Sequence, residues 1–481
     1  MVIQKSVKIF KKYQTFFVFL LIFGLSLFLF YPSLNYYFFQ DDWFVLNRVR
    51  AGDLASFFQF RTDIIYWRPL SMPLFFAVNK TLFGLNPFRF HLVAFFLFFL
   101  LIIVIYFLFK ILTCDRKLSL LMSFFYAIWP IHFTSLSWLS TTSYVIGPLF
   151  QVLSFIFFAN FVKRRKFLLW LVSFLFFLFG LASSELTIVL PAVFFAWGLF
   201  IKKQKYLKLL LPFIAVVCAY LFLRIFLFKI PSRGAYQIYF NWQIINNFFW
   251  YLGWAMGLPE SFKSLIFPSL PEQSMKIIIQ FWRITIPFLL ICLLIIKMIT
   301  NKFGKNFRLY LFAFFWVFIG LVPVITLINH SSPMYLSFSG LGFLYALTFA
   351  LRASPKIFWM LLTILWTVIS FTNLEFTRAT HWIRNEQAIS RAYMTYVKEH
   401  ISHARAESIF LFRPADLSFA KKHNFVLVET EDTLRQSLNE QDAIQVIYND
   451  SSLQSIYAKA QDQIKLPSSF KVFEIIPRID D

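Results

Sequence analysis

The hydrophobic and polar positions of this chain alternate on the scale of whole segments, not of single residues. Runs of apolar residues, each close to the length of about 20 that a helix needs to cross a bilayer, are separated by short polar or basic stretches. Backbone polar groups inside a bilayer must be paired within their own segment, so each run is predicted to be a helix. We predict about 11 transmembrane helices, at residues 14–34, 88–111, 118–136, 143–162, 167–183, 186–201, 206–228, 277–297, 309–328, 335–351 and 357–374.

Two apolar stretches do not fit a simple crossing. Residues 69–84 have the pattern of a short amphipathic helix that lies on the membrane interface. Residues 242–257 belong to a long loop, 229–276, and are apolar enough either to span the membrane or to re-enter it. We predict an interfacial or re-entrant helix there, because a full crossing would place the later basic loops on the opposite side.

The pattern changes after residue 374, where charge rises and the apolar runs shorten. Helices are predicted at 384–400 and 431–440, and short strands at 408–412, 424–428, 444–448 and 470–474. The predicted fold class is therefore an all-α polytopic membrane protein with a small α/β C-terminal domain. Residues 1–374 form the transmembrane domain, and residues 375–481 form a small soluble domain outside the membrane.

Composition and charge agree with a membrane protein. Hydrophobic residues make up 59% of the chain and charged residues only 14%, compared with about 25% charge in soluble domains. The net charge of +23 comes from basic clusters between apolar runs, such as Lys163–Lys166, which is how orientation is encoded in membrane proteins. These clusters predict a multi-pass protein of the cell membrane with a cytoplasmic N-terminus and an extracytoplasmic C-terminal domain. No separate basic patch indicates a nucleic-acid partner.

Several common chemistries have no sequence support. The only cysteines, Cys114, Cys218 and Cys292, lie far apart in or beside apolar runs, without the spacing of a metal site or a disulfide framework. There is neither a phosphate-binding P-loop nor a dinucleotide fingerprint. The first apolar run is too long for the core of a cleaved signal peptide, so it is predicted to be a retained helix. We expect no cofactor; a divalent metal at the acidic pair described next is the less favoured alternative.

The most unusual polar feature is the adjacent pair Asp41 and Asp42, directly after the first predicted helix. Two carboxylates this close resist double ionisation, so one pKa is expected to rise. A carboxylate with such a pKa could accept a proton near neutral pH. The alternative interpretation is a pair that is simply solvated in the first outside loop.

Other ionisable residues fall on the same predicted side. Arg68 could bind a carboxylate or phosphate, or could anchor the chain at the interface. Glu185 follows an apolar run, and an ionisable residue at membrane depth is a functional candidate. Arg224 could bind a lipid phosphate or snorkel to the surface. His91 and His132 are weaker candidates, because a single histidine near a helix end is more often structural.

The order of these motifs resembles the membrane glycosyltransferases of the GT-C fold. It is most similar to protein O-mannosyltransferases and to transmembrane mannosyltransferases that carry tetratricopeptide repeats. The resemblance covers residues 31–224 well and the remainder loosely. The matching motifs are, in chain order, Asp41-Asp42, Trp67–Ser71, Leu82–Pro87 with His91, Pro130–His132, Trp138–Ser140, Ser184–Pro191 and Arg224.

The chain also departs from that family. Ser184 stands where the family has a lysine before its glutamate. Residues 332–337, which include Tyr335, are a degraded form of the family's Arg-Tyr-x-Tyr-Leu-Pro motif. The tetratricopeptide repeats are absent, so the acceptor is expected to differ from that of the repeat-bearing relatives.

The resemblance implies transfer of a sugar, a hexose such as mannose, from a polyprenyl-phosphate carrier to a hydroxyl on a protein, glycan or lipid acceptor at the extracytoplasmic face. It implies inversion at the sugar, with Asp41 as the base and Asp42 orienting it or sharing the proton. Arg224 would hold the lipid phosphate with help from Arg68, and Glu185 would bind hydroxyl groups. The remaining substrate-binding candidates are His91, His132 and Tyr335.

Two other functions remain open at this stage. A transporter or flippase of lipid-linked sugars would also need many spans and buried charges. Such proteins tend to show repeated halves and broken helices near the midplane, and neither is evident in this sequence. A membrane scaffold with a partner-binding outer domain would not need the ordered polar motifs of the first half.

Overall fold

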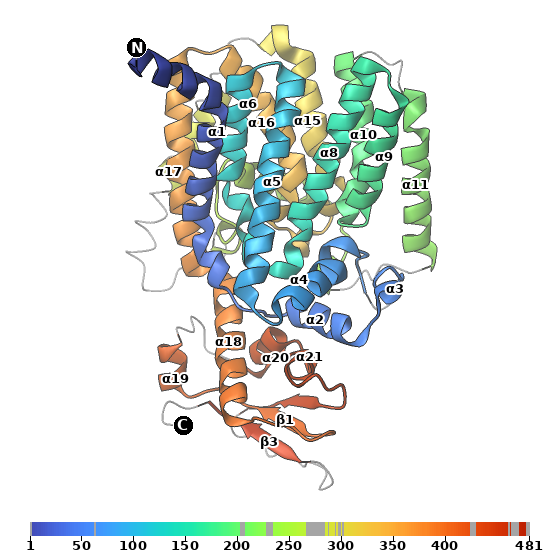
Figure 1. The fold of residues 1–481 in the computed structure, drawn as a ribbon, viewed down its shortest axis with the longest axis vertical. Helices are drawn as coiled ribbons and strands as arrows, with labels where there is room; N and C mark the ends of the chain where they lie inside the picture. The colour runs from blue at the N-terminus through green and yellow to red at the C-terminus, as the bar shows by residue number, and fades with distance from the viewer. Residues whose placement is uncertain are drawn as a thin grey trace.

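The structure is a computed structural model that describes residues 2–61, 64–202, 207–227, 234–265, 284–286, 288–293, 295–296, 300, 303–423, 430–459, 462 and 471–477. A bundle of long helices stands above a small domain, and the chain begins at the far end of the bundle from that domain (Figure 1). The principal helices of the bundle are α1 (Val2–Phe30), α5 (Pro87–Thr113), α6 (Arg116–Ala127), α8 (Ser143–Arg164), α9 (Phe167–Leu181), α10 (Leu190–Trp197), α11 (Leu211–Phe222), α15 (Phe303–Ile325), α16 (Leu336–Arg352) and α17 (Lys356–Thr380).

The described part of the chain confirms a polytopic helical membrane protein. It contains 7 helices that are long and apolar enough to cross a bilayer, or up to 8 if α6 and the helical segment Pro130–Ser137, bent by 47° from it, form one span. Shorter apolar helices at Phe167–Leu181 and Glu185–Ile201 coincide with two further predicted spans. The predicted span at 277–297 is described only in part, at 284–286, 288–293 and 295–296.

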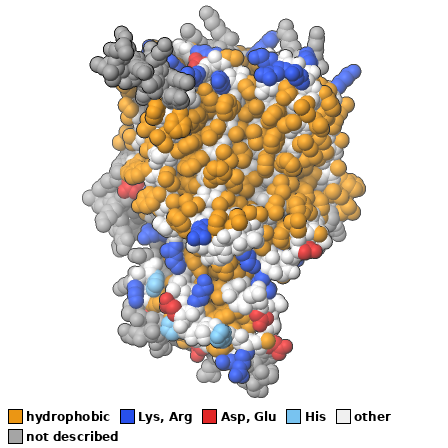
Figure 2. Space-filling view, viewed as in Figure 1, with side chains coloured by type: hydrophobic (Ala, Val, Ile, Leu, Met, Phe, Trp, Pro, Cys, Tyr) orange, Lys and Arg blue, Asp and Glu red, His pale blue; other side chains and the backbone are white. Residues whose placement is uncertain are grey.

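The predicted cytoplasmic turns lie together at one end of the bundle. Arg116 donates a hydrogen bond to the Thr15 hydroxyl, and Arg352 donates one of 2.5 Å to the Thr113 carbonyl. Figure 2 shows blue basic side chains along this upper edge and an orange apolar belt below them. This clustering is the pattern that the positive-inside rule expects of a cytoplasmic face.

The bundle interior is built from large aromatic side chains. Trp129, Trp316 and Trp366 are among the largest fully buried groups. The Trp129 indole donates a 3.0 Å hydrogen bond to the carbonyl of Ala255, the last residue of α12 (Gln243–Ala255). Because α12 has only 13 residues, at 1.5 Å per residue it is too short for the roughly 30 Å hydrocarbon core. Its length favours the predicted interfacial or re-entrant placement.

The predicted helix at 69–84 is present over most of its length. It begins as a π-helical turn at Leu70–Leu74, continues as α4 (Phe75–Phe83) and ends at Gly84, whose φ of +61° is a conformation that glycine adopts at little cost. The Ser71 hydroxyl donates a 2.5 Å bond to the Ser183 carbonyl. This contact brings the start of this helix beside the loop that precedes Glu185.

In its described residues, the C-terminal domain combines four helices with a small sheet. The helices are α18 (Trp382–His400), α19 (Leu417–Lys422), α20 (Glu431–Leu438) and α21 (Asp442–Tyr448). The strands are β1 (Ile409–Phe412), β2 (Gln454–Tyr457) and β3 (Val472–Ile475), all parallel and in the order β2-β1-β3. All four residues of the central strand β1 are buried, as expected for a parallel strand covered on both faces.

One predicted strand is wrong. Residues 444–448 form most of helix α21, which packs against α2 (Asp41–Ala51). The apolar run is too short to distinguish a strand from a buried helix, and Ile444 and Val446 are buried in either form. Strand β2 was not predicted, since its sequence mixes polar and apolar residues. The predicted strand 424–428 lies outside the described residues.

Several hydrogen bonds connect the C-terminal domain to α2 and to the residue before it. The backbone amide of Gln40 donates a 3.0 Å bond to the Ser437 carbonyl. The Asn47 amide donates a 2.6 Å bond to Asp442, and the Trp43 indole donates a 2.9 Å bond to the Ser390 hydroxyl. Helix α17 also continues to Thr380, past the predicted domain boundary at residue 374. The domain therefore fixes the helix whose first residue is Asp41.

Candidate active site

A cavity of about 300 Å³ lies at the end of the bundle that faces the C-terminal domain. Its wall includes the first turn of α8, the last turn of α15, the residues just before α16, the end of the α11 segment and the start of α2. Its wall is mostly apolar but contains charged and aromatic polar side chains from distant parts of the sequence. These are Asp41, Tyr66, Arg68, Tyr144, Glu185, Tyr220, Arg224, Tyr236, His330 and Tyr335.

Asp41 is held at the cavity wall as the first residue of α2. The Tyr66 hydroxyl donates a 3.2 Å hydrogen bond to its carboxylate. Burial raises the pKa of Asp41 above its ordinary value of 3.8, although the Tyr66 hydrogen bond and the charge of Arg68 oppose that rise. The preceding residue, Gln40, has a φ of +47°, a costly conformation for a residue other than glycine. The Ser437 contact holds this turn in place.

Asp42 points away from the cavity into the protein. It is 1% exposed, and its carboxylate accepts bonds of 2.8 Å from the Ser140 amide and 2.6 Å from the Ser140 hydroxyl. A longer contact of 3.4 Å comes from the Phe39 amide. Burial raises the pKa of Asp42 to about 7 despite these donors. The two adjacent carboxyl groups therefore have different surroundings, one beside the cavity and one inside the fold.

Arg68 and Glu185 form an ion pair on the cavity wall. The Arg68 Nε donates a 2.7 Å bond to Glu185, and its Nη2 donates to the other carboxylate oxygen, which makes the pair bidentate. The remaining guanidinium donors reach the Ser143 hydroxyl at 3.1 Å and the Tyr144 hydroxyl at 2.9 Å. The charge and the hydrogen-bonding capacity of Arg68 are thus used largely within the protein.

Arg224 is a buried cation of a different kind. It lies in the π-helical turn Leu223–Leu227 that extends α11, and it is only 5% exposed. Within the part of the chain that the structure describes, it has no hydrogen-bond or ion-pair partner. Tyr220, one turn earlier on the same face, also lines the cavity. Glu185 acts on this guanidinium electrostatically but forms no ion pair with it, so the position favours an anionic ligand.

A group of aromatic side chains completes the wall. The rings of Tyr144 and Tyr335 meet edge to face at 5.2 Å, and the rings of Tyr236 and His330 lie 4.5 Å apart. Tyr335 is fully within the bundle, at the start of α16. Aromatic faces and phenol groups of this kind suit a ligand with both apolar and hydroxyl surfaces, such as a sugar.

The structure brings five of the predicted site residues to one cavity and leaves three outside it. The five are Asp41, Arg68, Glu185, Arg224 and Tyr335. The other three, Asp42, His91 and His132, do not line it. The ring of His91 contacts the Leu136 carbonyl at 3.0 Å, and the ring of His132 packs between Phe98 and Tyr126 in the core.

Several lining residues were not singled out from the sequence. Tyr66 lies two positions before Arg68 but was not itself predicted to be a site residue. Tyr220 precedes Arg224 by four positions, a spacing that places both on one helix face and could have identified it. Tyr144, Tyr236 and His330 carry no such local signal, because only the fold brings their segments together.

Gly147 sets the distance between α8 and the loop that carries Glu185. A Cβ atom at Gly147 would lie 2.6 Å from the Cβ of Ser184, which cannot rotate away because it is attached directly to the backbone. We expect Gly147→Ala to lower the free energy of unfolding by about 1–3 kcal/mol, measured as a lower thermal midpoint. Gly24→Ala is the matched control, since nothing lies within 4 Å of that position. Equal midpoints for the two variants would contradict this packing argument.

Among the residues that the structure describes, no group of three or more His, Cys, Asp or Glu side chains could hold a metal ion. The carboxylates on the cavity wall are Asp41 and Glu185, and the latter is engaged by Arg68. The chemistry that this wall itself offers is proton acceptance by a carboxylate and charge stabilisation by a guanidinium.

Comparison with known proteins gives structural similarities but no match in sequence. No protein-family profile matches the chain, and no curated protein matches its sequence. Among solved structures, the chain aligns with the crystal structure of the Archaeoglobus fulgidus oligosaccharyltransferase in complex with Zn and sulfate, with a TM-score of 0.47 and 12% identity. The alignment covers 87% of this chain and 61% of that one, so this chain spans less than two thirds of its length. An activity must therefore be inferred from the site itself.

Proposed function

We propose that this protein is an integral membrane glycosyltransferase of the GT-C type. It transfers a sugar, a hexose such as mannose, from a polyprenyl-phosphate carrier to a hydroxyl acceptor on the extracytoplasmic side. The observation that supports this most strongly is that Asp41 and Arg224 line the same cavity, at the end of a membrane bundle. A proton acceptor and a phosphate-binding cation are the two groups that such a transfer requires.

The surroundings of Arg224 suit a donor that is anchored in the membrane. Phe222, Ile225 and Phe226, which flank it on the α11 segment, are exposed on the outside of the protein. Figure 1 shows α11 at the edge of the bundle, where lipid would contact it. A polyprenyl chain can therefore lie along α11 in the bilayer while its phosphate reaches Arg224 inside the cavity.

The proposed reaction is a single displacement. The acceptor hydroxyl gives its proton to Asp41, and its oxygen forms a bond with the anomeric carbon of the sugar. The bond from that carbon to the phosphate oxygen breaks, and its electron pair leaves with the polyprenyl phosphate. The second pKa of a phosphate monoester is near 6, so this group can leave without a general acid. Arg224 stabilises the charge that develops on it, and attack from the opposite face inverts the anomeric centre.

The ion pair changes the role expected for Arg68. The sequence led us to expect that it would help Arg224 to hold the phosphate, but two hydrogen bonds to Glu185 already occupy one edge of its guanidinium. We assign Arg68 to positioning Glu185, whose carboxylate oxygens would then accept hydrogen bonds from hydroxyl groups of the sugar or the acceptor. Asp42 is likewise a positioning residue, because it fixes the start of α2 to Ser140.

A transporter or flippase of lipid-linked sugars is the second candidate. Substrate sites of secondary transporters lie near the bilayer midplane, between repeated halves. The cavity here lies instead at one end of the bundle, next to the C-terminal domain. This one-sided location favours chemistry at the membrane surface over passage through the protein.

Turnover of a defined donor tests the proposal. The full chain, purified into lipid nanodiscs, is incubated with radiolabelled polyprenyl-phosphate mannose or glucose and a cell-envelope extract as acceptor. We expect protein-dependent loss of label from the lipid carrier and its appearance in the acceptor fraction. Binding of both donors without release of label would overturn the transferase proposal and favour transport.

Arg224→Gln tests the proposed phosphate contact separately. Loss of a charged hydrogen-bond partner is worth about 1.5–3 kcal/mol, so we expect the KM for the donor to rise by on the order of 10-fold to 100-fold. The KM for the acceptor should change little, because the acceptor does not carry the phosphate. The two values are measured by varying each substrate at saturating concentration of the other. An equal rise in both would argue against a donor-specific role.

A further inference from the structure

A second cavity, of about 650 Å³, lies between the bundle and the C-terminal domain. Its wall is formed by the last turns of α17, the first turns of α18, part of α19 and the chain around Tyr36. It shares no lining residue with the candidate active site. Because α17 is a candidate membrane span that ends at Thr380, this cavity lies at the boundary between the membrane and water.

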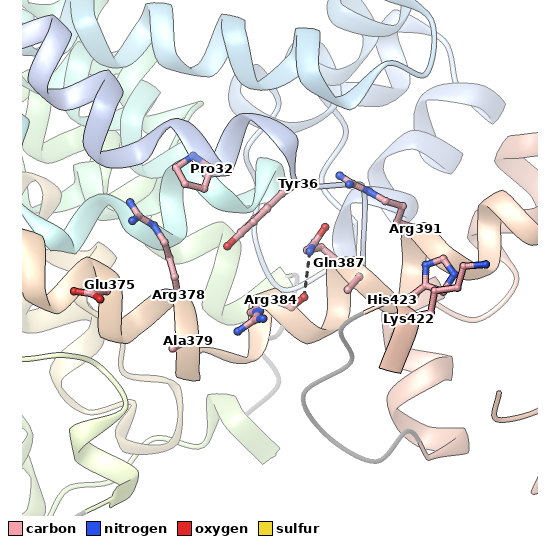
Figure 3. A pocket seen from close by; sticks show the side chains of 11 residues that line it. Pro32, Tyr36, Glu375, Arg378, Ala379, Arg384, Gln387, Arg391, Lys422 and His423 are labelled. Carbon is pink, nitrogen blue, oxygen red and sulfur yellow. Dashed lines mark hydrogen bonds between the residues drawn. The ribbon is translucent and has the colours of Figure 1, made fainter. Parts of the chain in front are cut away.

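The cavity is strongly basic. Arg378, Arg384 and Arg391 line it from α17 and α18, and Lys422 lines it from α19, whereas Glu375 is the acid on its wall. Figure 2 shows basic side chains gathered at the neck between the apolar belt and the C-terminal domain. Figure 3 shows the Tyr36 hydroxyl between Arg378 and Arg384, and both guanidinium groups act electrostatically on it.

Hydrogen bonds within the protein occupy only some of the guanidinium donors of these arginines. Arg391 donates a hydrogen bond to the Asn35 carbonyl and lies 6.0 Å from the centre of the Tyr37 ring. By contrast, the Nη2 atom of Arg378 is buried and has no hydrogen-bond partner. Within the described chain, the side chain of Arg384 likewise forms no hydrogen bond or ion pair. A buried guanidinium donor without a partner is costly, which points to a ligand that supplies acceptor oxygens.

We propose that this cavity binds a phosphate group, and we favour the headgroup of an anionic membrane phospholipid as its source. Guanidinium groups bind the oxygens of phosphates and carboxylates with paired, charge-assisted hydrogen bonds, which an uncharged sugar cannot offer. The Tyr36 hydroxyl adds a neutral donor. The position at the membrane boundary is the depth at which lipid phosphates lie, and basic pockets at this depth are suited to lipid headgroups. A soluble phosphate ester offers the same chemistry and is the other source to test.

Binding is measured without reference to catalysis, so this proposal can fail while the transferase proposal stands. The full-length protein in neutral detergent is titrated with phosphatidylglycerol or phosphatidylcholine of identical chains, and bound lipid is counted by native mass spectrometry. Glycerol phosphate is added as a soluble competitor in a parallel series. The variants are Arg378→Gln combined with Arg384→Gln, the charge-retaining Arg384→Lys, and Arg89→Gln as an exposed basic control on α5.

We expect preferential binding of phosphatidylglycerol that falls on the order of fivefold for each arginine removed, is largely retained in Arg384→Lys, and is unchanged in Arg89→Gln. If glycerol phosphate binds with the same dependence on the arginines and phosphatidylglycerol does not bind, the phosphate site is supported and a soluble ester is identified as its source. Equal binding of both lipids, or equal losses in the cavity and control variants, would overturn the proposal. Unfolding midpoints within a few degrees of wild type confirm that each variant is folded.

Discussion

Asp41→Asn is expected to abolish sugar transfer while leaving the protein folded. Proton acceptance by a positioned carboxylate contributes on the order of 100-fold to 10,000-fold to a rate, and asparagine cannot accept the proton. The substitution keeps the shape of the side chain and can still accept the Tyr66 hydrogen bond. Turnover of the lipid-linked donor should therefore fall by about 100-fold to 10,000-fold, with donor binding retained.

The same variant should be as stable as the wild type or more stable, although its activity falls. Burial raises the pKa of Asp41, so its charged form at neutral pH is disfavoured in the folded state relative to the unfolded chain. Removing that charge leaves the free energy of unfolding unchanged or higher near pH 7. The thermal midpoint of Asp41→Asn should accordingly equal or exceed that of wild type.

The raised pKa also predicts the pH profile of the wild-type enzyme. Asp41 must be deprotonated to act as a base, so the rate should rise with pH through an apparent pKa above the ordinary 3.8. A plot of kcat/KM against pH reports this pKa for the free enzyme. A rate that is flat from pH 4 upward would contradict the assignment of Asp41 as the base.

Asp42→Asn is the matched control, one position along the chain. One oxygen of the Asp42 carboxylate accepts both hydrogen bonds from Ser140, and the other accepts the longer bond from the Phe39 amide. In an asparagine, an NH2 group would replace that second oxygen and face the Phe39 N–H donor. Burial raises the pKa of Asp42 to about 7, so loss of the buried charge offsets part of this cost. We therefore expect a loss of at most about 1–3 kcal/mol in the free energy of unfolding and a partial loss of activity. Full stability with complete inactivity in Asp42→Asn, and an active Asp41→Asn, would reverse the two roles.

Much of the fold and part of the site could be predicted because the membrane imposes simple rules. Apolar runs marked the helices that the structure describes, and the charges left between or inside those runs were few enough to be conspicuous. Asp41, Arg68, Glu185 and Arg224 were recognised for that reason, and all four line one cavity. Their individual roles in catalysis remain predictions.

The arrangement of those residues could not be predicted, because it depends on contacts between distant segments. Nothing local distinguishes Asp41 from Asp42; only the approach of Ser140 turns one carboxyl into the interior. The pairing of Arg68 with Glu185 joins residues 117 positions apart. The helix at 442–448 also depends on a contact between distant segments. The short apolar run allows a strand or a helix equally, and packing against α2 decides between them.

Breaking the Arg68–Glu185 pair is expected to have the largest effect on stability. The side chain of Arg68 is 9% exposed and that of Glu185 is 30% exposed, so either group left alone is a largely buried, unpaired charge. Removing one partner of such a pair costs about 3–5 kcal/mol in buried sites. Because Glu185 faces the cavity, where water can reach it, we expect each of Arg68→Gln and Glu185→Gln to cost about 3 kcal/mol, at the lower end of that range.

The double variant separates this pairing from a general loss of packing. Once both charges are absent, neither is left buried and unpaired, so the double variant should be less destabilised than the sum of the single variants by about 1–3 kcal/mol. Chemical unfolding of all four proteins gives this coupling energy. The exposed pair of Arg435 and Asp432 is the control, where Arg435→Gln should change stability by less than about 1 kcal/mol.

Activity then distinguishes a structural pair from one that also contacts substrate. If Glu185 binds a hydroxyl of the sugar or acceptor, Glu185→Gln should lose activity even at temperatures where it is fully folded. Arg68→Lys, which keeps the charge but loses the bidentate geometry, should retain more activity than Glu185→Gln because the carboxylate is still present. If the stability changes of the two single variants add up to that of the double variant, the two side chains act independently. If the changes are strongly coupled but the kinetics of the variants are unaltered, the pair only holds the cavity wall together.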